Sequence, residues 1–341
     1  MASVDLTVMG AGVAGLSVAY VCALRGARVR VIDPFGVGAG ASGGLVGALA
    51  PHVPEAWNDK KAFQLDALLM AERWWAGVAQ VSGLATGYAR LGRVQGLDDA
   101  RAVAQAQARA ISARAIWGDR AVWRVRAAQG AWEPVTPTGL VIEDTLSARL
   151  HPRLACDALA AAVRALGGEV VRDGRPDGPV VWATGAAGLR ELSTALGREV
   201  GRGEKGQAIA LRIEAGAVAQ VYADGLHVVP HVDGTVAVGS TSERVYDAAN
   251  TVDGLLDALH ARAVAVLPVL AGAPVVARWA GERPRAASRA PLLGQWPGRA
   301  GQFVCNGGFK IGFGLAPKIA GVMADLVLDG RDAVPESFRL M

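Results

Sequence analysis

The sequence predicts an α/β protein in which a parallel-sheet domain is interrupted by an α+β domain with an antiparallel sheet. A strand, a helix and a second strand follow one another in the first 33 residues, the order that builds a parallel pair. Helical segments and then an alternating strand-turn-strand segment occupy the middle of the chain. Because an apolar strand and a helix return near the C-terminal end, we expect the chain to leave the first domain and re-enter it.

The N-terminal unit has the simplest pattern. Residues 4–9 form an apolar run of strand length, 13–24 have helical character, and 28–32 form a second apolar run that ends at Asp33. A loop rich in glycine and alanine, 36–47, follows this acid. The two runs are therefore expected to be parallel strands joined by a helix.

Three helices and one buried strand are predicted next. Residues 60–79 and 98–116 are polar and aromatic helical stretches, and apolar residues recur at helical spacing in the second, so this part of the chain is expected to be a helical insert. A third helix, 152–166, ends at the stop signal Gly167-Gly168. Residues 179–183 are all apolar, as in a parallel strand that is buried on both faces.

The second half of the chain alternates as an antiparallel hairpin does. The pattern covers 207–239, and Asp233-Gly234 supplies the turn. The other predicted elements are strands at 274–279 and 302–305 and helices at 252–266 and 314–328.

The composition is that of a globular protein with a large core. Of the 341 residues 52% are hydrophobic and 19% are charged. The net charge of +4 is spread thinly, and no basic stripe interleaved with aromatic residues marks a nucleic-acid surface. No uninterrupted run of about 18 apolar residues is present, so no membrane span is expected.

The cysteines and histidines indicate a reducing, cytoplasmic setting and no metal site. Cys22, Cys156 and Cys305 are odd in number and far apart, which argues against a disulfide framework. The histidines show no metal-ligand spacing beyond one i,i+4 pair, which a proline interrupts. The first apolar run contains an acid and has no basic flank, so no signal peptide is expected.

A dinucleotide-binding fingerprint lies between the first strand and the first helix. Gly10 allows a tight turn, Gly12 lets the backbone approach a pyrophosphate, and Gly15 lets the helix pack closely on the strand. Asp33 ends the second strand, where its carboxylate can accept hydrogen bonds from ribose hydroxyls. The cofactor-binding residues predicted here are Gly10, Gly12, Val13, Ala14, Gly15, Asp33 and Pro34.

The fingerprint alone does not separate NAD from FAD, but three further segments favour FAD. Small residues and a hydroxyl at 41–44 suit the passage of a pyrophosphate and ribityl chain, and 181–185 is a strand that runs into Thr-Gly. Glycines at 306–314 open the last helix, whose N–H groups could face the edge of a flavin that gains negative charge on reduction. The residues predicted to bind FAD in these segments are Ala41, Ser42, Gly43, Gly44, Val46, Gly47, Thr184, Gly185, Gly308, Phe309, Lys310, Ile311, Gly312, Phe313, Gly314 and Leu315.

Together these segments resemble the D-amino acid oxidase superfamily, and most its glycine oxidase, sarcosine oxidase and D-amino acid dehydrogenase branch. The resemblance is strongest in 4–52, 179–185 and 227–325, which include Trp-Ala-Gly-Glu-Arg-Pro at 279–284 and Gly-Phe-Lys-Ile-Gly at 308–312. It implies a Rossmann-like FAD-binding domain and hydride transfer to flavin from the carbon that bears an amine, which leaves an imine that hydrolyses.

The resemblance also implies how the chain is divided between two domains. The FAD-binding domain is expected to be discontinuous and to comprise 1–50, 145–205 and 275–341. The substrate domain is expected to comprise 51–144 and 206–274 and to form the other wall of the pocket.

Four residues are predicted to meet the substrate. In the family, the arginine matched by Arg283 forks onto the substrate carboxylate. Lys310 matches a position that is an arginine in glycine oxidases and a lysine in sarcosine oxidases, so its ammonium could hold the second oxygen; the alternative is a solvated surface lysine. The alternative for Arg283 is an ion pair with its neighbour Glu282. His227 stands where the family often has a tyrosine, so it could donate a hydrogen bond or accept the amine proton, and Ser242 indicates a more polar pocket.

Two other predictions concern the flavin and the residues near it. No cysteine lies in 280–284, the stretch that matches the flavin tether of sarcosine oxidases, so FAD is expected to be bound non-covalently. His52 could approach the far edge of the flavin, although a histidine in a loop is the simpler interpretation.

The predicted substrate is a small amino acid or amine such as glycine, sarcosine or a D-amino acid, and the electron acceptor is oxygen or a quinone or carrier. The alternatives are an oxidase acting on a modified tRNA base, which the thin charge disfavours, and a non-catalytic FAD-binding subunit of an amine dehydrogenase complex. The absence of a Gly-Asp-Ala strand end argues against a monooxygenase. The sequence leaves homo-oligomer formation open.

Overall fold

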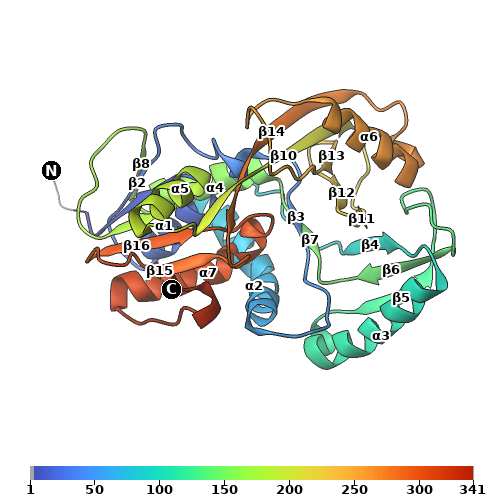
Figure 1. Cartoon of the computed structure of the whole chain (residues 1–341), viewed down its shortest axis with the longest axis horizontal. Coiled ribbons are helices and arrows are strands. Elements are labelled where there is room, and N and C mark those ends of the chain that lie inside the picture. The colour runs from blue at the N-terminus through green and yellow to red at the C-terminus, as the bar shows by residue number, and fades with distance from the viewer. Residues whose placement is uncertain (1–3, 341) are drawn as a thin grey trace.

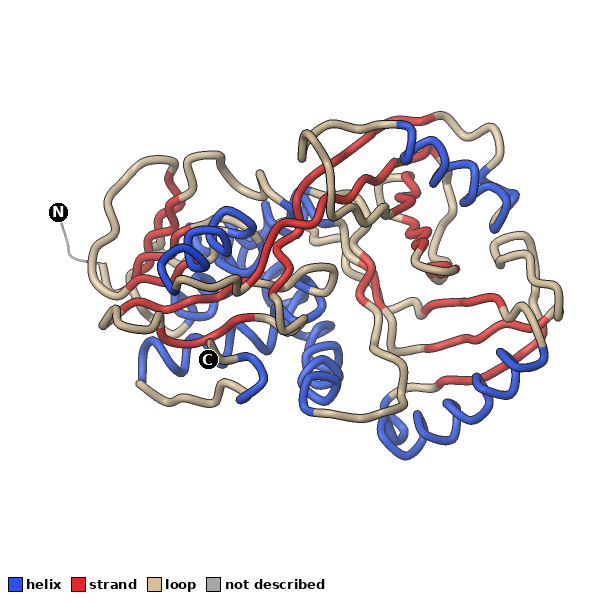
Figure 2. The backbone as a smooth tube through the Cα atoms, in the orientation of Figure 1, coloured by secondary structure: helices blue, strands red, loops and turns tan. Residues whose placement is uncertain are grey.

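A computed structural model describes residues 4–340 and contains two large sheets, each at the centre of its own lobe (Figure 1). Figure 2 shows the strands gathered into two groups, which are joined by two long strands that run from one group to the other. These are β10 (Gly201–Arg212) and β14 (Val275–Ala286), which pair antiparallel from Gly201 opposite Ala286 to Leu211 opposite Val275. The mixed α/β class is therefore as predicted.

The first sheet has six strands, and its centre is parallel. β1 pairs parallel with both β2 and β9, while β8 and β16 continue the parallel order on either side. Only the edge strand β15 is antiparallel. In spatial order the strands are β15 (Leu292–Gln295), β16 (Gln302–Asn306), β9 (Val180–Trp182), β1 (Leu6–Met9), β2 (Val29–Ile32) and β8 (Glu169–Val171).

Helices cover this first sheet and build the main core. α1 (Val13–Leu24) packs against α4 (Pro152–Ala165) and α7 (Gly312–Asp329), and α2 (Asp59–Ser82) packs against the same two helices. Nine of the twelve residues of α1 are buried, which explains why its sequence is apolar almost all round. α5 (Gly185–Leu196) instead packs against β10, β14 and β16.

The second sheet has eight strands and is mostly antiparallel; only β4 and β11 pair in parallel. α3 (Ala100–Trp117) packs on β5, and α6 (Gly254–Val266) packs on β10, β12 and β13. A two-stranded ribbon of β3 (Ala48–Leu49) and β7 (Ala148–Arg149) lies between the lobes. From edge to edge the eight-stranded sheet is β14, β10, β13 (Thr235–Gly239), β12 (Leu226–Pro230), β11 (Gln220–Ala223), β4 (Arg93–Gly96), β6 (Leu140–Asp144) and β5 (Trp123–Ala127).

The structure corrects three details of the sequence interpretation. The insert expected to be helical also contributes β4, β5 and β6, short strands that pair only with one another and with β11. The stretch 207–239 is four strands with two tight turns, at Asp224-Gly225 as well as Asp233-Gly234. The strand expected at 274–279 continues to Ala286, because every residue beyond Trp279 still pairs with β10.

Candidate functional site

The turn between β1 and α1 accepts only glycine at two of its positions. Gly10 has φ +111°, and a Cβ there would lie 2.5 Å from the carbonyl oxygen of Ala183. A Cβ on Gly15 would lie 2.0 Å from the carbonyl oxygen of Gly10. The fingerprint glycines therefore bring β1, β9 and α1 together at the carboxyl end of the parallel strands, where open α/β sheets bind their ligands.

The N-terminus of α1 can receive an anion. Its N-cap is Gly12, which supplies no side-chain cap, and no acidic residue lies in the first turn. The hydroxyl of Ser42 accepts a hydrogen bond of 3.0 Å from the amide of Val13. A helix end without an acidic cap, next to a hydroxyl, suits the pyrophosphate of a dinucleotide.

Asp33 follows β2 and supports the same turn. Its Oδ2 accepts a hydrogen bond of 2.8 Å from the amide of Ala11, and its Oδ1 accepts one of 3.0 Å from the amide of Phe35. An ionised carboxylate has about four acceptor positions, so about two remain for the hydroxyls of a ribose. The acid is thus oriented by the backbone beside the glycine turn.

The loop 36–47 lies against this turn and is itself constrained. The amide of Gly38 donates to the carbonyl oxygen of Ala11 over 2.9 Å. Gly47 has φ +65°, and a Cβ there would lie 1.9 Å from the carbonyl oxygen of Leu150, so this position also requires glycine. A pocket of about 370 Å³ adjoins the loop and is lined by Val37, Gly38, Ala39, Gly43, Arg153, Cys156, Asp157 and Trp279.

The start of α7 lies beside the start of α1. A Cβ on Gly312 would be 3.6 Å from Cγ1 of Val13. The N-cap Ile311 provides no side-chain cap, and the first turn contains no acid. Two helix N-termini with free N–H groups therefore share one region, which favours a ligand that carries negative charge at more than one point.

The remaining predicted cofactor residues adjoin the same region. Thr184 and Gly185 follow β9, and the side-chain amide of Asn306 donates to the carbonyl oxygen of Gly185 over 2.9 Å. A Cβ on Gly239, at the end of β13, would lie 2.4 Å from Cγ2 of Val46, so the loop 36–47 also touches the antiparallel sheet. The structure brings the five predicted cofactor segments together.

Arg283 is buried without a carboxylate partner among residues 4–340. Its side chain is 8% exposed, and its one hydrogen bond runs from Nη1 to the carbonyl oxygen of Thr241 over 3.2 Å. The guanidinium lies across Gly206, where a Cβ would be 1.8 Å from Nη1. Burial lowers the pKa of Arg283 to about 10, while Glu204 and Glu243 act in the opposite direction.

Lys310 lies near Arg283, in the turn that precedes α7. Its Nζ is 5.5 Å from the centre of the Phe309 ring and has no carboxylate partner within residues 4–340. Although much of the side chain is exposed, partial burial lowers the pKa of Lys310, and the charge of Arg283 lowers it further. The backbone of this turn is fixed by a hydrogen bond of 3.0 Å from the amide of Phe309 to the carbonyl oxygen of Pro284.

His227 lies on β12 and faces the same cations. It is half-buried, and burial together with Arg93, Lys310 and Arg283 lowers its pKa to about 3. Its Nδ1 is buried and has no hydrogen-bond partner within the described chain. The imidazole is therefore neutral at ordinary pH.

Ser242 is exposed, and its hydroxyl contacts the buried carboxylate of Glu204. Glu204 also accepts a hydrogen bond of 2.7 Å from Nη1 of Arg285. Burial alone would raise the pKa of Glu204, but these two partners lower it below its usual value. A carboxylate thus lies directly across from Arg283 in the β10–β14 pair without contacting it.

The comparisons with known proteins agree with this geometry. The profile described as FAD dependent oxidoreductase matches residues 5–326. The chain belongs to this family. Glycine oxidase from Geobacillus kaustophilus is 26% identical over 378 residues, which cover 95% of this chain and 92% of that protein.

Closer identity is confined to part of the chain. Glycine oxidase from Pseudomonas putida is 42% identical over 108 residues, which are 31% of this chain and 29% of that enzyme. A second glycine oxidase, from Pseudomonas aeruginosa, is matched over 36% of its length at 34% identity. The chain thus matches about a third of the length of these two relatives.

Solved structures share the fold over nearly the full length. The crystal structure of glycine oxidase from Geobacillus kaustophilus has a TM-score of 0.83 at 22% identity and covers 99% of this chain and 98% of that one. Iminodiacetate oxidase from Chelativorans sp. BNC1 has a TM-score of 0.83 at 23% identity, with 98% of each chain covered. The prediction of an FAD-binding protein of the D-amino acid oxidase type is confirmed.

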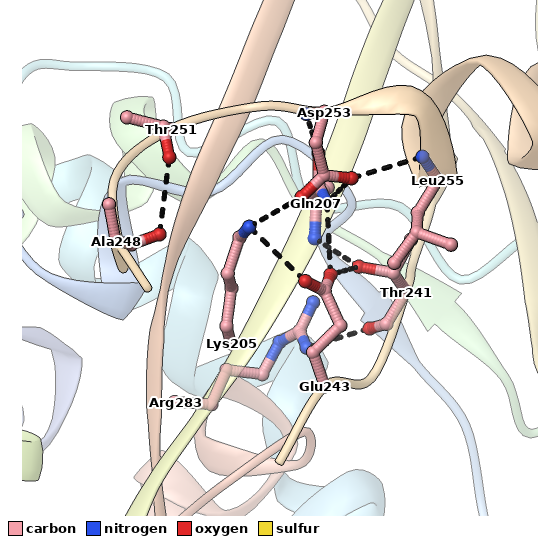
Figure 3. Close-up of polar contacts among 9 residues, drawn as sticks. All are labelled: Lys205, Gln207, Thr241, Glu243, Ala248, Thr251, Asp253, Leu255 and Arg283. Atoms are coloured by element: carbon pink, nitrogen blue, oxygen red, sulfur yellow. Dashed lines mark hydrogen bonds and ion pairs between the residues drawn. The ribbon is translucent and has the colours of Figure 1, made fainter. Parts of the chain in front are cut away.

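The sequence motifs of this FAD dependent oxidoreductase do not reveal the polar residues behind Arg283. Lys205 and Gln207 are buried on β10, and Thr241 and Glu243 follow β13 (Figure 3). Glu204, also on β10, is buried as well. The signal available was three polar or charged residues within the four positions 204–207, directly before the apolar run 208–211 of the same strand. Buried polar groups of this kind need partners, and their partners lie about 40 residues away in sequence.

The surroundings of His52 are those of a structural residue. The ring of His52 contacts the side-chain amide of Gln64, whose oxygen also accepts from the backbone amide of His52 over 2.8 Å, as a structural loop histidine would. No helix within residues 4–340 is long and apolar enough to cross a membrane. The same residues contain no group of three or more histidines, cysteines or acids placed to hold a metal ion.

Proposed function

We propose that this FAD dependent oxidoreductase oxidises the C–N bond of a small amino acid or secondary amine, of the glycine, sarcosine or D-amino acid type, and releases an imine that water hydrolyses. The observation that carries the proposal is the buried guanidinium of Arg283, which lacks a carboxylate partner among the described residues. Burying an arginine without its counter-ion costs free energy that a bound carboxylate would recover.

Three side chains supply the recognition in this proposal. Arg283 offers two parallel N–H groups to the substrate carboxylate, and Lys310 adds a single positive charge from the turn before α7. His227, neutral because its pKa is about 3, offers a hydrogen bond and does not serve as the base. Ser242 contributes to the pocket indirectly, because its hydroxyl contacts the carboxylate of Glu204.

FAD, when bound, accepts the hydride from the carbon that bears the amine. The chain's contribution is to hold and orient both molecules. We propose that the glycine turn at 10–15 and Asp33 hold the ADP portion, that the loop 41–47 holds the ribityl chain, and that the start of α7 provides N–H groups beside the ring. These donors would favour the reduced, more negative flavin.

We propose non-covalent binding of FAD. The three cysteines, Cys22, Cys156 and Cys305, are free and buried, and burial raises the pKa of each thiol. Thiols that remain protonated are poor nucleophiles, and none lies in 280–284. Free, buried thiols also fit the reducing, cytoplasmic setting that we propose.

We also propose the domain division expected from the sequence, with 1–50, 145–205 and 275–341 binding FAD and 51–144 and 206–274 forming the substrate wall. The boundary at 205 falls inside β10, which pairs with β14 along its whole length. The two domains are thus continuous through a shared pair of strands, and this pair carries Arg283.

The test is anaerobic mixing of the purified, flavin-loaded protein with glycine, sarcosine, D-amino acids and iminodiacids. Loss of the long-wavelength flavin absorption band identifies the substrate, and readmission of oxygen then distinguishes an oxidase from a dehydrogenase that needs a quinone or another carrier. A yellow protein that no member of the panel bleaches would contradict the proposal and favour a non-catalytic FAD-binding subunit.

A further inference from the structure

The segment after β13 is held against β10 by a cluster of polar side chains, in which Asp253 is exposed and the others are largely buried (Figure 3). Lys205 is 2% exposed, and its Nζ lies 2.8 Å from Oδ2 of Asp253 and 3.2 Å from Oε2 of Glu243. The side-chain amide of Gln207, which is fully buried, donates to the same two acids over 2.7 and 3.0 Å. One cation and one amide therefore hold two carboxylates that come from the two ends of the segment 243–253.

Thr241 joins this cluster to Arg283. Its hydroxyl accepts a hydrogen bond of 2.8 Å from the backbone amide of Gln207, and the same hydroxyl donates its O–H to Oε1 of Glu243. Its own amide donates to the carbonyl oxygen of Gln207 over 3.2 Å. Its carbonyl oxygen accepts from Nη1 of Arg283 over 3.2 Å. The cluster thus fixes the direction of a carbonyl that holds the guanidinium.

Other contacts of Arg283 do not fix its orientation. Gly206 provides a flat surface without a side chain, and the ring of Trp279 lies 6.0 Å from Cζ. Glu204 and Glu243 favour the charged guanidinium without contacting it. Nη1 donates its hydrogen bond to the Thr241 carbonyl. The Nε–Nη2 edge has no acceptor within residues 4–340, so it can donate two parallel hydrogen bonds to a carboxylate.

We propose that Thr241 is a positioning residue for Arg283, whose hydroxyl, held by Gln207 and Glu243, aims the carbonyl that orients the guanidinium toward the substrate carboxylate. The inference rests on the proposed function in one respect, namely that Arg283 receives a carboxylate. It adds that the affinity for the carboxylate depends on a hydroxyl that never contacts the substrate.

Two variants of Thr241 test the hydroxyl. Thr241→Val keeps the shape and the carbonyl but removes both hydroxyl bonds, and Thr241→Ser restores the hydroxyl. The matched control is Thr251→Val in the same segment, because the Thr251 hydroxyl is exposed and donates only to the carbonyl of Ala248. We expect KM for the amino acid substrate to rise about tenfold in the valine variant, with flavin content and kcat little changed, and to return in the serine variant.

Acetate provides a readout without turnover, because it offers a carboxylate and no C–N bond. Its dissociation constant, followed by the perturbation of flavin absorption in the holoenzyme, is expected to rise about tenfold in Thr241→Val and to stay unchanged in Thr251→Val. If the wild type binds acetate but oxidises no amino acid, the proposed function is contradicted and the positioning role of Thr241 is not. If the wild type is active and Thr241→Val binds acetate and substrate with wild-type affinity, the positioning role of Thr241 is contradicted and the proposed function is not.

A double-mutant cycle separates positioning from general stability. If Thr241 acts through Arg283, Thr241→Val should change the dissociation constant of acetate less than twofold when it is added to Arg283→Lys, since the guanidinium that it orients is gone. The same loss of about tenfold in both backgrounds would show that Thr241 acts independently of Arg283, and would overturn the proposal.

Discussion

Glu282 and Arg283 are neighbours on β14 but point to opposite faces of the sheet, and of the two only Glu282 has an ion-pair partner within residues 4–340. Nη1 and Nη2 of Arg190 lie 3.0 and 3.1 Å from the two oxygens of Glu282, and the hydroxyl of Tyr246 contacts the same carboxylate. The pairing of Arg283 with Glu282, which the sequence left open, is thereby excluded. A strand places successive side chains on alternate faces, so the adjacent acid cannot neutralise the buried arginine.

Replacement of Arg283 by alanine should raise KM for carboxylated substrates about a hundredfold, because two charge-assisted hydrogen bonds would be lost. The flavin content should not change, since Arg283 lies on β14 and away from the glycine turn at 10–15. Arg278→Ala is the control: this arginine is on the same strand but pairs with the exposed Asp257 over 2.9 Å. Steady-state kinetics with unaltered KM in Arg283→Ala would remove this residue from the site.

Gly206→Ala should reduce activity almost as strongly as the loss of Arg283 itself. A Cβ at this position would lie within 2.1 Å of three guanidinium atoms, so Arg283 would have to leave its place. The matched control is Gly321→Ala on α7, where an added Cβ meets nothing within 4 Å and alanine favours the helix. If Gly206→Ala retains wild-type kcat/KM, the orientation of Arg283 across Gly206 does not matter for the reaction.

The sequence was sufficient to predict the nucleotide-binding turn, because the interactions there are local. The helix expected at 13–24 has these bounds in the structure, and Asp33 follows β2 as expected. The glycines that define the turn are required by contacts with β9 and by a positive φ, both consequences of one strand-turn-helix geometry. Short-range pattern and backbone sterics determine this part of the fold.

The surroundings of Arg283 could not be predicted in the same way. Gly206, Thr241 and Lys205 become its neighbours only through the long pairing of β10 with β14 and the return of the chain after β13. Pro284 inside β14 also obscured the length of that strand, since proline is unusual within strands but is tolerated at a sheet edge, where β14 lies. Long-range register, which one sequence does not disclose, determines the site.

Gly12→Ala should weaken the binding of FAD while leaving the fold intact. Gly12 has φ −83°, which alanine adopts freely, and an added Cβ would meet only the hydroxyl of Ser42, at 3.1 Å. The new methyl group would, however, occupy space that we assign to the pyrophosphate. We expect at least about a tenfold rise in the dissociation constant for FAD, measured by titrating the apoprotein.

Gly321→Ala serves again as the control, because this glycine has helical backbone inside α7 and an added Cβ meets nothing within 4 Å. Circular dichroism should show both apoproteins folded. A Gly12→Ala protein that retains a full complement of flavin with wild-type affinity would contradict the assignment of this turn to the pyrophosphate.

His227→Asn should make the protein less sensitive to acid. The pKa of His227 falls from 6.5 to about 3 on folding, so between these values the unfolded chain binds a proton that the folded chain does not. The free energy of unfolding therefore decreases as pH falls through this window. Without this imidazole, the slope of that free energy against pH between 4 and 6.5 should become shallower by up to about 1.4 kcal/mol per pH unit.

His231 provides the internal comparison for this experiment. Burial lowers its pKa to about 4, so it should keep part of the acid sensitivity in the variant. Denaturant titrations at several pH values measure the slopes, and the kcat/KM profile above pH 6 should keep its shape, because a histidine that is neutral there is not the titrating base. Equal slopes in both proteins would mean that His227 is solvated in the native state.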